Sequence, residues 1–155
     1  MFRALCLAFA ALALSACSSL PARTFALEFP EAGREDTLSV VNAARSGAGR
    51  STMRIDEKAQ KAARRHARSM AEAGKMAHVL PGGPGFAKRL EEDGINTAAA
   101  ENIAYGQKDV AAAVEAWMNS KGHRRNLLNG KYEGVGVASA EGSDGRLYWA
   151  MVLVP

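Results

Sequence analysis

Three residues carry side chains suited to metal binding or acid–base chemistry and stand in or beside expected loops: His78, Glu101 and His123. Two imidazoles and a carboxylate can bind a divalent cation such as zinc and leave one coordination position open. The same groups can serve as general acid and base, because histidine titrates near neutral pH. No local spacing brings the three together, and each histidine taken singly is more often a hydrogen-bonded structural residue.

Other residues are weaker candidates for chemistry. His66 lies beside an apolar helical stripe, which favours packing, and Glu115 is expected to face solvent on its helix. The hydroxyls of Ser69, Ser120 and Ser139 are potential nucleophiles, but none of these serines lies in a Gly-x-Ser-x-Gly turn.

The first seventeen residues predict a secretory signal rather than a part of the fold. Arg3 precedes an apolar run that is too short for a good membrane-spanning helix. The run ends in Leu14-Ser15-Ala16-Cys17, which resembles the lipobox of bacterial lipoproteins. That resemblance implies cleavage before Cys17, lipid on Cys17 and a firm membrane anchor. The resemblance also implies export to the outer membrane, because Ser18 rather than Asp follows the cysteine. The alternative to a lipoprotein is a soluble secreted protein that is cleaved nearby.

Cysteine usage and charge exclude several functions. Cys6 leaves with the signal and Cys17 carries lipid, so the mature domain has no disulfide, thiol nucleophile or thiolate metal site. The sequence has 20 basic and 16 acidic residues, and the loss of Arg3 leaves a net charge of about +3. The basic residues are scattered, without an aromatic-interleaved stripe, so we expect no nucleic-acid partner.

The pattern of residues predicts helices first and strands last. Residues 18–35 hold two prolines and no sustained period, which indicates a flexible tether to the lipid. Helical spacing, capping residues and terminal glycines predict four helices: one from Asp36 or Thr37 to about 46, one from Asp56 to Gly74, one over 86–92, and one from Asp109 that ends by Gly122.

Loops and strands fill the remainder. Residues 78–85 are rich in proline and glycine and predict a loop, and residues 100–106 predict an irregular connection. The stretches "EGVGVASA" and "RLYWAMVLV" have strand character and flank "EGSDG", which indicates an antiparallel hairpin. The fold class is therefore expected to be α+β.

Five segments, in order, resemble the CAP superfamily of cysteine-rich secretory proteins, antigen 5 and pathogenesis-related proteins, in its short bacterial form. The segments are "VVNAARSGAG", "DEKAQKAARRHARSMAEAGKMAH", "FAKRLEEDGINTAAAENIAYG", "AAAVEAWMNSKGHRRNLLNGKYEGVGVA" and "LYWAMVLV". Two positions depart from the family pattern: Ala100 replaces the glycine of "GENIA", and Lys121 replaces the proline before "GHR".

The resemblance implies a CAP domain over residues 36–155, with a three-layer α-β-α sandwich around a central antiparallel sheet. It also implies a cleft where two histidines meet acidic residues, which places His78, Glu101 and His123 together. Ser120 stands where many eukaryotic members have the second acid, and we expect Ser120 and Asn126 to support the cleft as polar groups.

Three functions remain open from the sequence. The leading hypothesis is an envelope lipoprotein that binds a small ligand, a lipid or a metal ion such as zinc in the cleft without catalysis. The second is a metal-assisted hydrolase that uses the same residues. The third is a structural or interaction module of the envelope, with another envelope protein as its partner.

Overall fold

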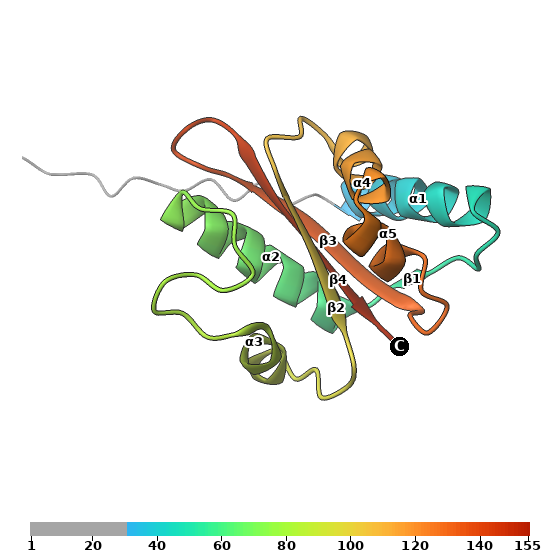
Figure 1. Ribbon diagram of the computed structural model, residues 1–155, viewed down its shortest axis with the longest axis horizontal. Helices are drawn as coiled ribbons and strands as arrows, with labels where there is room; N and C mark the ends of the chain where they lie inside the picture. The colour runs from blue at the N-terminus through green and yellow to red at the C-terminus, as the bar shows by residue number, and fades with distance from the viewer. Residues whose placement is uncertain (1–30) are drawn as a thin grey trace, which may run out of the picture.

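The computed structural model describes residues 31–155, with side chains from Asp36 onward. The expected signal sequence, Cys17 and most of the expected tether lie outside these residues. The helices are α1 Glu31–Gly47, α2 Glu57–Ala73, α3 Phe86–Glu92, α4 Val110–Asn119 and α5 Lys121–Leu127. The strands are β1 Arg54–Ile55, β2 Ala100–Tyr105, β3 Gly134–Glu141 and β4 Leu147–Val154 (Figure 1).

The four strands form one mixed sheet in the order β1-β3-β4-β2. β3 and β4 are the expected antiparallel hairpin, with Gly134 opposite Val154 and Glu141 opposite Leu147. β2 runs antiparallel to β4 and forms one edge of the sheet. The short β1, which the sequence pattern did not predict, runs parallel to β3, so the sheet is not wholly antiparallel.

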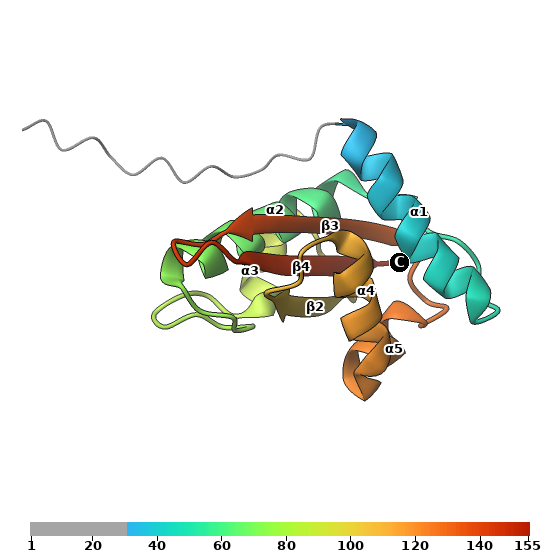
Figure 2. The ribbon, with the colours of Figure 1, turned by 90° about the horizontal axis from the view of Figure 1, so that it is seen from above.

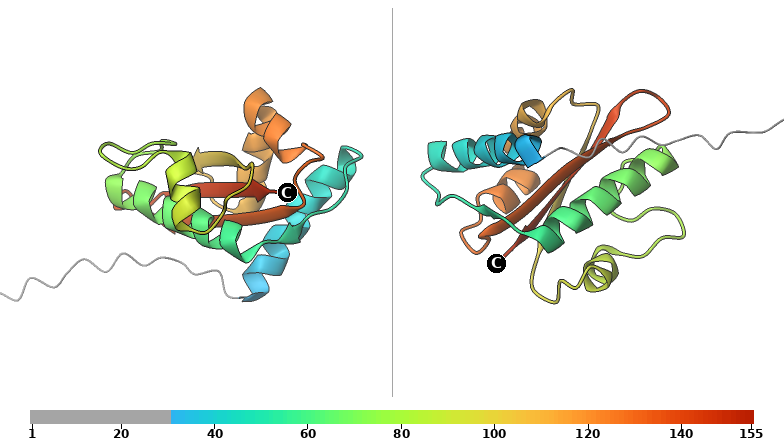
Figure 3. Two further views of the ribbon diagram at one scale, coloured as in Figure 1. Left: turned by 90° about the horizontal axis from the view of Figure 1, so that it is seen from below. Right: turned by 180° about the vertical axis from the view of Figure 1, so that it is seen from behind.

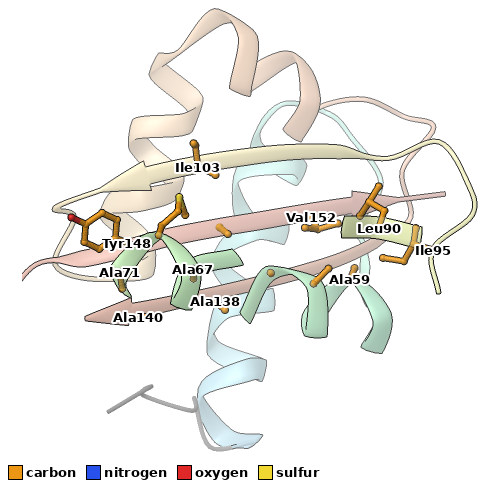
Figure 4. Close-up of a cluster of buried hydrophobic side chains, with 14 of the residues drawn as sticks. Ala59, Ala67, Ala71, Leu90, Ile95, Ile103, Ala138, Ala140, Tyr148 and Val152 are labelled. Carbon is orange, nitrogen blue, oxygen red and sulfur yellow. The ribbon is translucent and has the colours of Figure 1, made fainter. Parts of the chain in front are cut away.

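The two faces of the sheet carry separate cores, as a three-layer α-β-α sandwich requires. In β4, Tyr148, Ala150 and Val152 pack with α2 and α3, whereas Trp149 and Met151 pack with α1, α4 and α5. Figure 4 shows the first core between α2 and the strands. Figure 2 shows the sheet between its helical layers, and α2 lies in front of the strands in the right-hand view of Figure 3.

α2 packs unusually close to the sheet because both sides of the contact are small. Ala59, Ala63 and Ala67 are fully buried along its inner face. Opposite them, a Cβ on Gly136 of β3 would lie 2.2 Å from the carbonyl carbon of Ala59 and the amide nitrogen of the next residue. The helix begins and ends as predicted: the Asp56 carboxylate accepts a hydrogen bond from the backbone amide of Ala59, and the left-handed Gly74 follows Ala73.

Two element predictions from the sequence were wrong, and one helix was not predicted. α1 begins at Glu31 rather than at Asp36 or Thr37, so the last residues of the expected tether are helical. Residues 100–105 form strand β2 through pairing with β4. The sequence did not predict it, because the polar but buried Glu101 and Asn102 interrupt the alternation of apolar and polar residues that is typical of a strand. The expected helix is capped by Asp109 and ends at Asn119, before Gly122 as predicted, but the short helix α5 that follows it was not predicted.

Within residues 31–155, the structure has no helix that is both long enough and apolar enough to cross a membrane.

Candidate functional site

The candidate site lies at the free edge of the sheet, on β2. Successive residues of a strand point to opposite faces, and Ile103 belongs to the core under α2 and α3. Glu101 therefore points toward α2 and α3, whereas Asn102 points toward α4 and α5. Because β2 is the last strand on this side, side chains from the two helical layers can meet around its edge.

Glu101 is the centre of a buried ionic cluster. Its side chain is only 3% exposed, and the Nδ1 atom of His78 lies 2.9 Å from its Oε1 atom. Arg89 of α3 donates to the Oε2 atom at 2.5 Å and is itself 11% exposed. The carboxylate thus has a charged or ring N–H partner on each oxygen, which is how a buried charge is tolerated.

Arg89 also holds the loop that carries His78. Its second terminal nitrogen donates to the backbone carbonyl of His78 at 2.6 Å and to that of Pro84 at 3.4 Å. Its guanidinium carbon lies 5.6 Å from the centre of the Phe86 ring. One side chain therefore fixes both the carboxylate that contacts His78 and the backbone of His78 itself.

His66 of α2 lies behind the carboxylate. It is 2% exposed, as the packing interpretation predicted, and its Nε2 atom is 3.7 Å from Oε1 of Glu101. Neither ring nitrogen has a hydrogen-bond partner within normal distance among the residues that the structure describes. Burial lowers the pKa of His66, and Arg89 and His78 lower it further, while Glu101 and the backbone of Ala77 oppose the shift. His66 is therefore a neutral imidazole at pH 7.

His123 reaches the same edge from the other helical layer. Asn102 donates through Nδ2 to the backbone carbonyl of His123 at 3.0 Å, and its Oδ1 accepts from Nδ2 of Asn126 at 3.0 Å. Burial lowers the pKa of His123, and the charge of nearby His78 lowers it further. His123 is half-buried and His78 is exposed, so both rings remain open to a ligand from outside.

The predicted residues thus fall into two contact groups on either side of β2. His78 hydrogen-bonds Glu101, and the predicted support residue Asn126 anchors the backbone of His123 through Asn102. Ser120 is the half-buried residue between α4 and α5, and the structure gives its hydroxyl no hydrogen bond with any residue of the described chain.

Sequence reasoning missed the roles of Arg89, His66 and Asn102. Asn102 follows Glu101 directly in "AENIA", so a polar pair within an otherwise apolar stretch was an available signal. His66 was noticed for its place beside the alanine stripe, but its approach to Glu101 depends on how α2 docks on the sheet. Arg89 carries no local signal, because its partners are reached only through the folded loop before α3.

The arrangement does not fit a three-ligand zinc centre. Both oxygens of Glu101 are already engaged, by His78 and Arg89. Over the part of the chain that the structure describes, no three His, Cys, Asp or Glu side chains are grouped closely enough to hold a metal ion. Apart from the buried His66, the ring nitrogens left for a cation belong to His78 and His123, so the carboxylate would act only through its bond to His78.

A small cavity adjoins the cluster on the α2–α3 side. It measures about 190 Å³, and His66, Ser69, Leu80, Pro84 and Arg89 are among its lining residues. Pockets for drug-sized ligands are usually larger, from about 300 Å³ upward. This cavity is therefore suited to a small molecule or to one end of a larger one.

Two relatives from Bacillus subtilis (strain 168) resemble this chain in sequence. It is 36% identical to protein YkwD over 105 residues, which are 67% of this chain and 41% of YkwD. It is 38% identical to the membrane protein YlbC over 101 residues, which are 64% of this chain and 29% of YlbC. The chain thus spans less than half the length of either curated relative.

Solved structures share the fold. An outer surface protein of Borrelia burgdorferi superposes with a TM-score of 0.69 at 21% identity, over 77% of this chain and 90% of that one. An extracellular protein of Bacillus anthracis that contains an SCP domain gives a TM-score of 0.68 at 27% identity, over 77% of this chain and 39% of that one. The model of the cysteine-rich secretory protein family, CAP, matches residues 38–153, nearly the whole described domain. The chain belongs to the cysteine-rich secretory protein (CAP) family.

Proposed function

We propose that this chain is an exported CAP protein that binds a small polar ligand between His78 and His123, at the edge of β2, without converting it. The observation that carries the proposal is the 2.9 Å contact between Nδ1 of His78 and the buried carboxylate of Glu101. Such a contact fixes the orientation of the imidazole and directs its Nε2 atom away from the carboxylate. An oriented ring nitrogen on an exposed side chain is suited to contact a ligand.

The surroundings suggest what such a ligand carries. His123 is neutral at pH 7 because its pKa is lowered, so it offers one donor and one acceptor nitrogen. Hydroxyl or carboxylate groups can hydrogen-bond both imidazoles, and a small apolar group can enter the cavity of about 190 Å³. A divalent cation is the less favoured ligand, because it would meet two imidazoles and no unpaired carboxylate.

We place the domain in the cell envelope, tethered by lipid on Cys17 to a membrane, with the outer membrane preferred. The support is the lipobox-like Leu14-Ser15-Ala16-Cys17 and the printed names of similar proteins, one an outer surface protein and one extracellular. Labelling cells with a radioactive fatty acid tests the anchor. Label should enter the wild-type protein and be lost in Cys17→Ser; label that persists in that variant contradicts the anchor.

Native mass spectrometry tests ligand binding directly. Residues 18–155, which include all of the described structure, would be exported to a periplasm and purified without a histidine tag. We expect an added mass, from a co-purified molecule or from a panel of hydroxy acids and zinc, that disappears in His78→Gln and in His123→Gln. Val79→Gln is the matched control, because Val79 is exposed beside His78.

A bare mass under all of these conditions contradicts the binding proposal. If His78→Gln and His123→Gln also lower the melting temperature by several degrees, the cluster is instead a structural tie between loops and sheet.

Hydrolysis is the second candidate, and the paired Glu101 and His78 favour it. A carboxylate that orients an imidazole is the arrangement of a general base that activates water. Release of product from peptide or ester substrates should then fall by at least about 100-fold in His78→Gln. Equal turnover by wild type and variant would assign the activity to a contaminant.

A further inference from the structure

A second polar surface lies on the opposite side of α5 from the candidate site. A hollow of about 520 Å³ is lined by Arg50, Lys121, Arg124 and Arg125, together with Asn129 and its neighbours Leu128 and Gly130. Four of its seven lining residues are basic and none is acidic. We call it the basic hollow. Its basic residues come from the turn after α1 and from α5, which are far apart in the sequence but are joined here by the fold.

The cations of the basic hollow have no anionic partners among the described residues. All four side chains are exposed, and the structure gives none of them an ion pair with a residue of the described chain. Arg65 on α2 differs, because it pairs with Glu92 and Asp93 at 2.9 Å each. Four like charges gathered without a counter-ion repel one another, and an anion bound among them would relieve that repulsion.

A fifth cation lies buried beside the basic hollow. Arg45 is 0% exposed, and within residues 31–155 its guanidinium bonds only to backbone carbonyls, those of Ser51 at 2.7 Å, Leu127 at 2.6 Å and Asn129 at 3.3 Å. Its other terminal nitrogen has no hydrogen-bond partner in this part of the chain. Burial lowers the pKa of Arg45, and the charge of Arg50 lowers it further. A buried guanidinium without a carboxylate gains from an anion placed nearby.

The geometry of α5 separates the basic hollow from the candidate site. Lys121, Arg124 and Arg125 stand at positions i, i+3 and i+4, which share one face of a helix. Asn126 lies toward β2 instead, where its side chain and the backbone carbonyl of His123 both bond to Asn102. Substitutions in the hollow can therefore be made without touching the groups that hold His123.

We propose that the basic hollow binds a phosphate-bearing anion about the size of a lipid head group. The planar fork of arginine matches phosphate oxygens in pairs, and three arginines here surround one space. The volume of about 520 Å³ falls in the range of small-molecule sites, so it admits more than a bare phosphate ion. The phosphate can belong to a soluble molecule or to the head group of a membrane lipid.

NMR titrations of the ¹⁵N-labelled domain, residues 18–155, distinguish a soluble phosphate from a lipid head group. One arm adds pyrophosphate, and the other adds vesicles of phosphatidylglycerol in phosphatidylcholine, with pure phosphatidylcholine as blank. The test variant is Arg124→Gln with Arg125→Gln. The matched control is Arg64→Gln with Arg68→Gln on α2, which removes the same charge from residues that also lack an ion pair within the described chain. Equal melting temperatures would verify that both variants fold.

We expect amide shifts at residues 50 and 121–130, and binding that is about 30-fold weaker in the test variant, since each basic residue near an anionic surface contributes roughly fivefold. The control variant should lose much less. A response to pyrophosphate alone assigns a soluble ligand, and a response to vesicles alone assigns a lipid head group. Equal losses in both variants, or no shift at the hollow with either probe, would overturn the proposal. His78→Gln should leave this binding unchanged, which separates it from ligand binding at the β2 edge.

Discussion

Replacing Arg89 with methionine removes the guanidinium from Glu101 while keeping the length and apolar stem of the side chain. The carboxylate, 3% exposed, loses a partner at 2.5 Å, and the His78 carbonyl loses one at 2.6 Å. Removing one partner of a buried pair costs about 3–5 kcal/mol, because the other charge is left uncompensated. Since Glu101 keeps His78 as a partner, we expect a loss near the lower figure, about 3 kcal/mol in the free energy of unfolding at pH 7.

Urea denaturation followed by tryptophan fluorescence measures this loss, because Trp117 and Trp149 are both 1% exposed in the folded state. The neighbouring Lys88→Met is the control: its pair with Glu91 is well exposed on both sides, so its removal should cost under about 0.5 kcal/mol. Arg89→Met combined with Glu101→Gln removes both charges, and the double variant should be more stable than the summed single effects by about 2 kcal/mol. An Arg89→Met cost below about 1 kcal/mol, or strict additivity, would refute the idea that a buried charge pair holds the β2 edge.

Three further changes test the packing around α2, each by urea denaturation. Gln60→Met removes a buried amide that donates to the Val137 carbonyl at 2.8 Å and accepts from its amide at 3.1 Å, and should cost about 2–4 kcal/mol; a neutral effect would mean that water replaces the amide. Gly136→Ala should destabilise the domain by about 3 kcal/mol or more, because the added Cβ clashes with the backbone of α2. Gly122→Ala should not, because its added Cβ would meet nothing within 4 Å. Similar losses of stability in the two variants would contradict the close packing of α2 on the sheet. The lowered pKa of His66 means that, at mildly acidic pH, the unfolded chain binds a proton that the folded chain excludes. The free energy of unfolding should therefore fall as the pH drops below about 6.5, by up to about 1.4 kcal/mol per pH unit for this residue. His66→Gln should flatten this dependence of stability on pH. An unchanged slope in that variant would exclude His66 as its source.

The elements that sequence predicted well are those that local chemistry determines. Asp56 and Asp109 cap their helices with side-chain bonds to the third following amide, and both were recognisable as caps. The β3–β4 hairpin was equally visible, because two β-rich runs flank a short polar turn. β1 and α5 were missed, since a two-residue strand and a seven-residue polar helix with one buried leucine present no period to detect.

The candidate site was predictable by residue type but not by geometry. His78 and Glu101 were named from the sequence and do meet, whereas the residues that hold them come from distant segments. Arg89 approaches Glu101 and the His78 carbonyl only when α3 docks, and the sequence around Arg89 is that of any exposed helix. A zinc site was a reasonable expectation from two histidines and a carboxylate, but only the fold reveals that Arg89 already occupies the carboxylate.

Without cysteines in the domain, buried polar side chains perform the cross-linking that disulfides provide elsewhere. Asn42 of α1 clamps the backbone of Met53 through both its amide groups, at 3.0 and 2.7 Å. Arg45 ties the end of the same helix to Leu127, the last residue of α5, and to Asn129 beyond it. These bonds join α1 to the segment before β1 and to the C-terminal end of α5. The C-terminal end of α5, the helix that carries His123 and three residues of the basic hollow, is therefore held to α1 by the bonds of Arg45 as well as by the burial of Leu127 in the core.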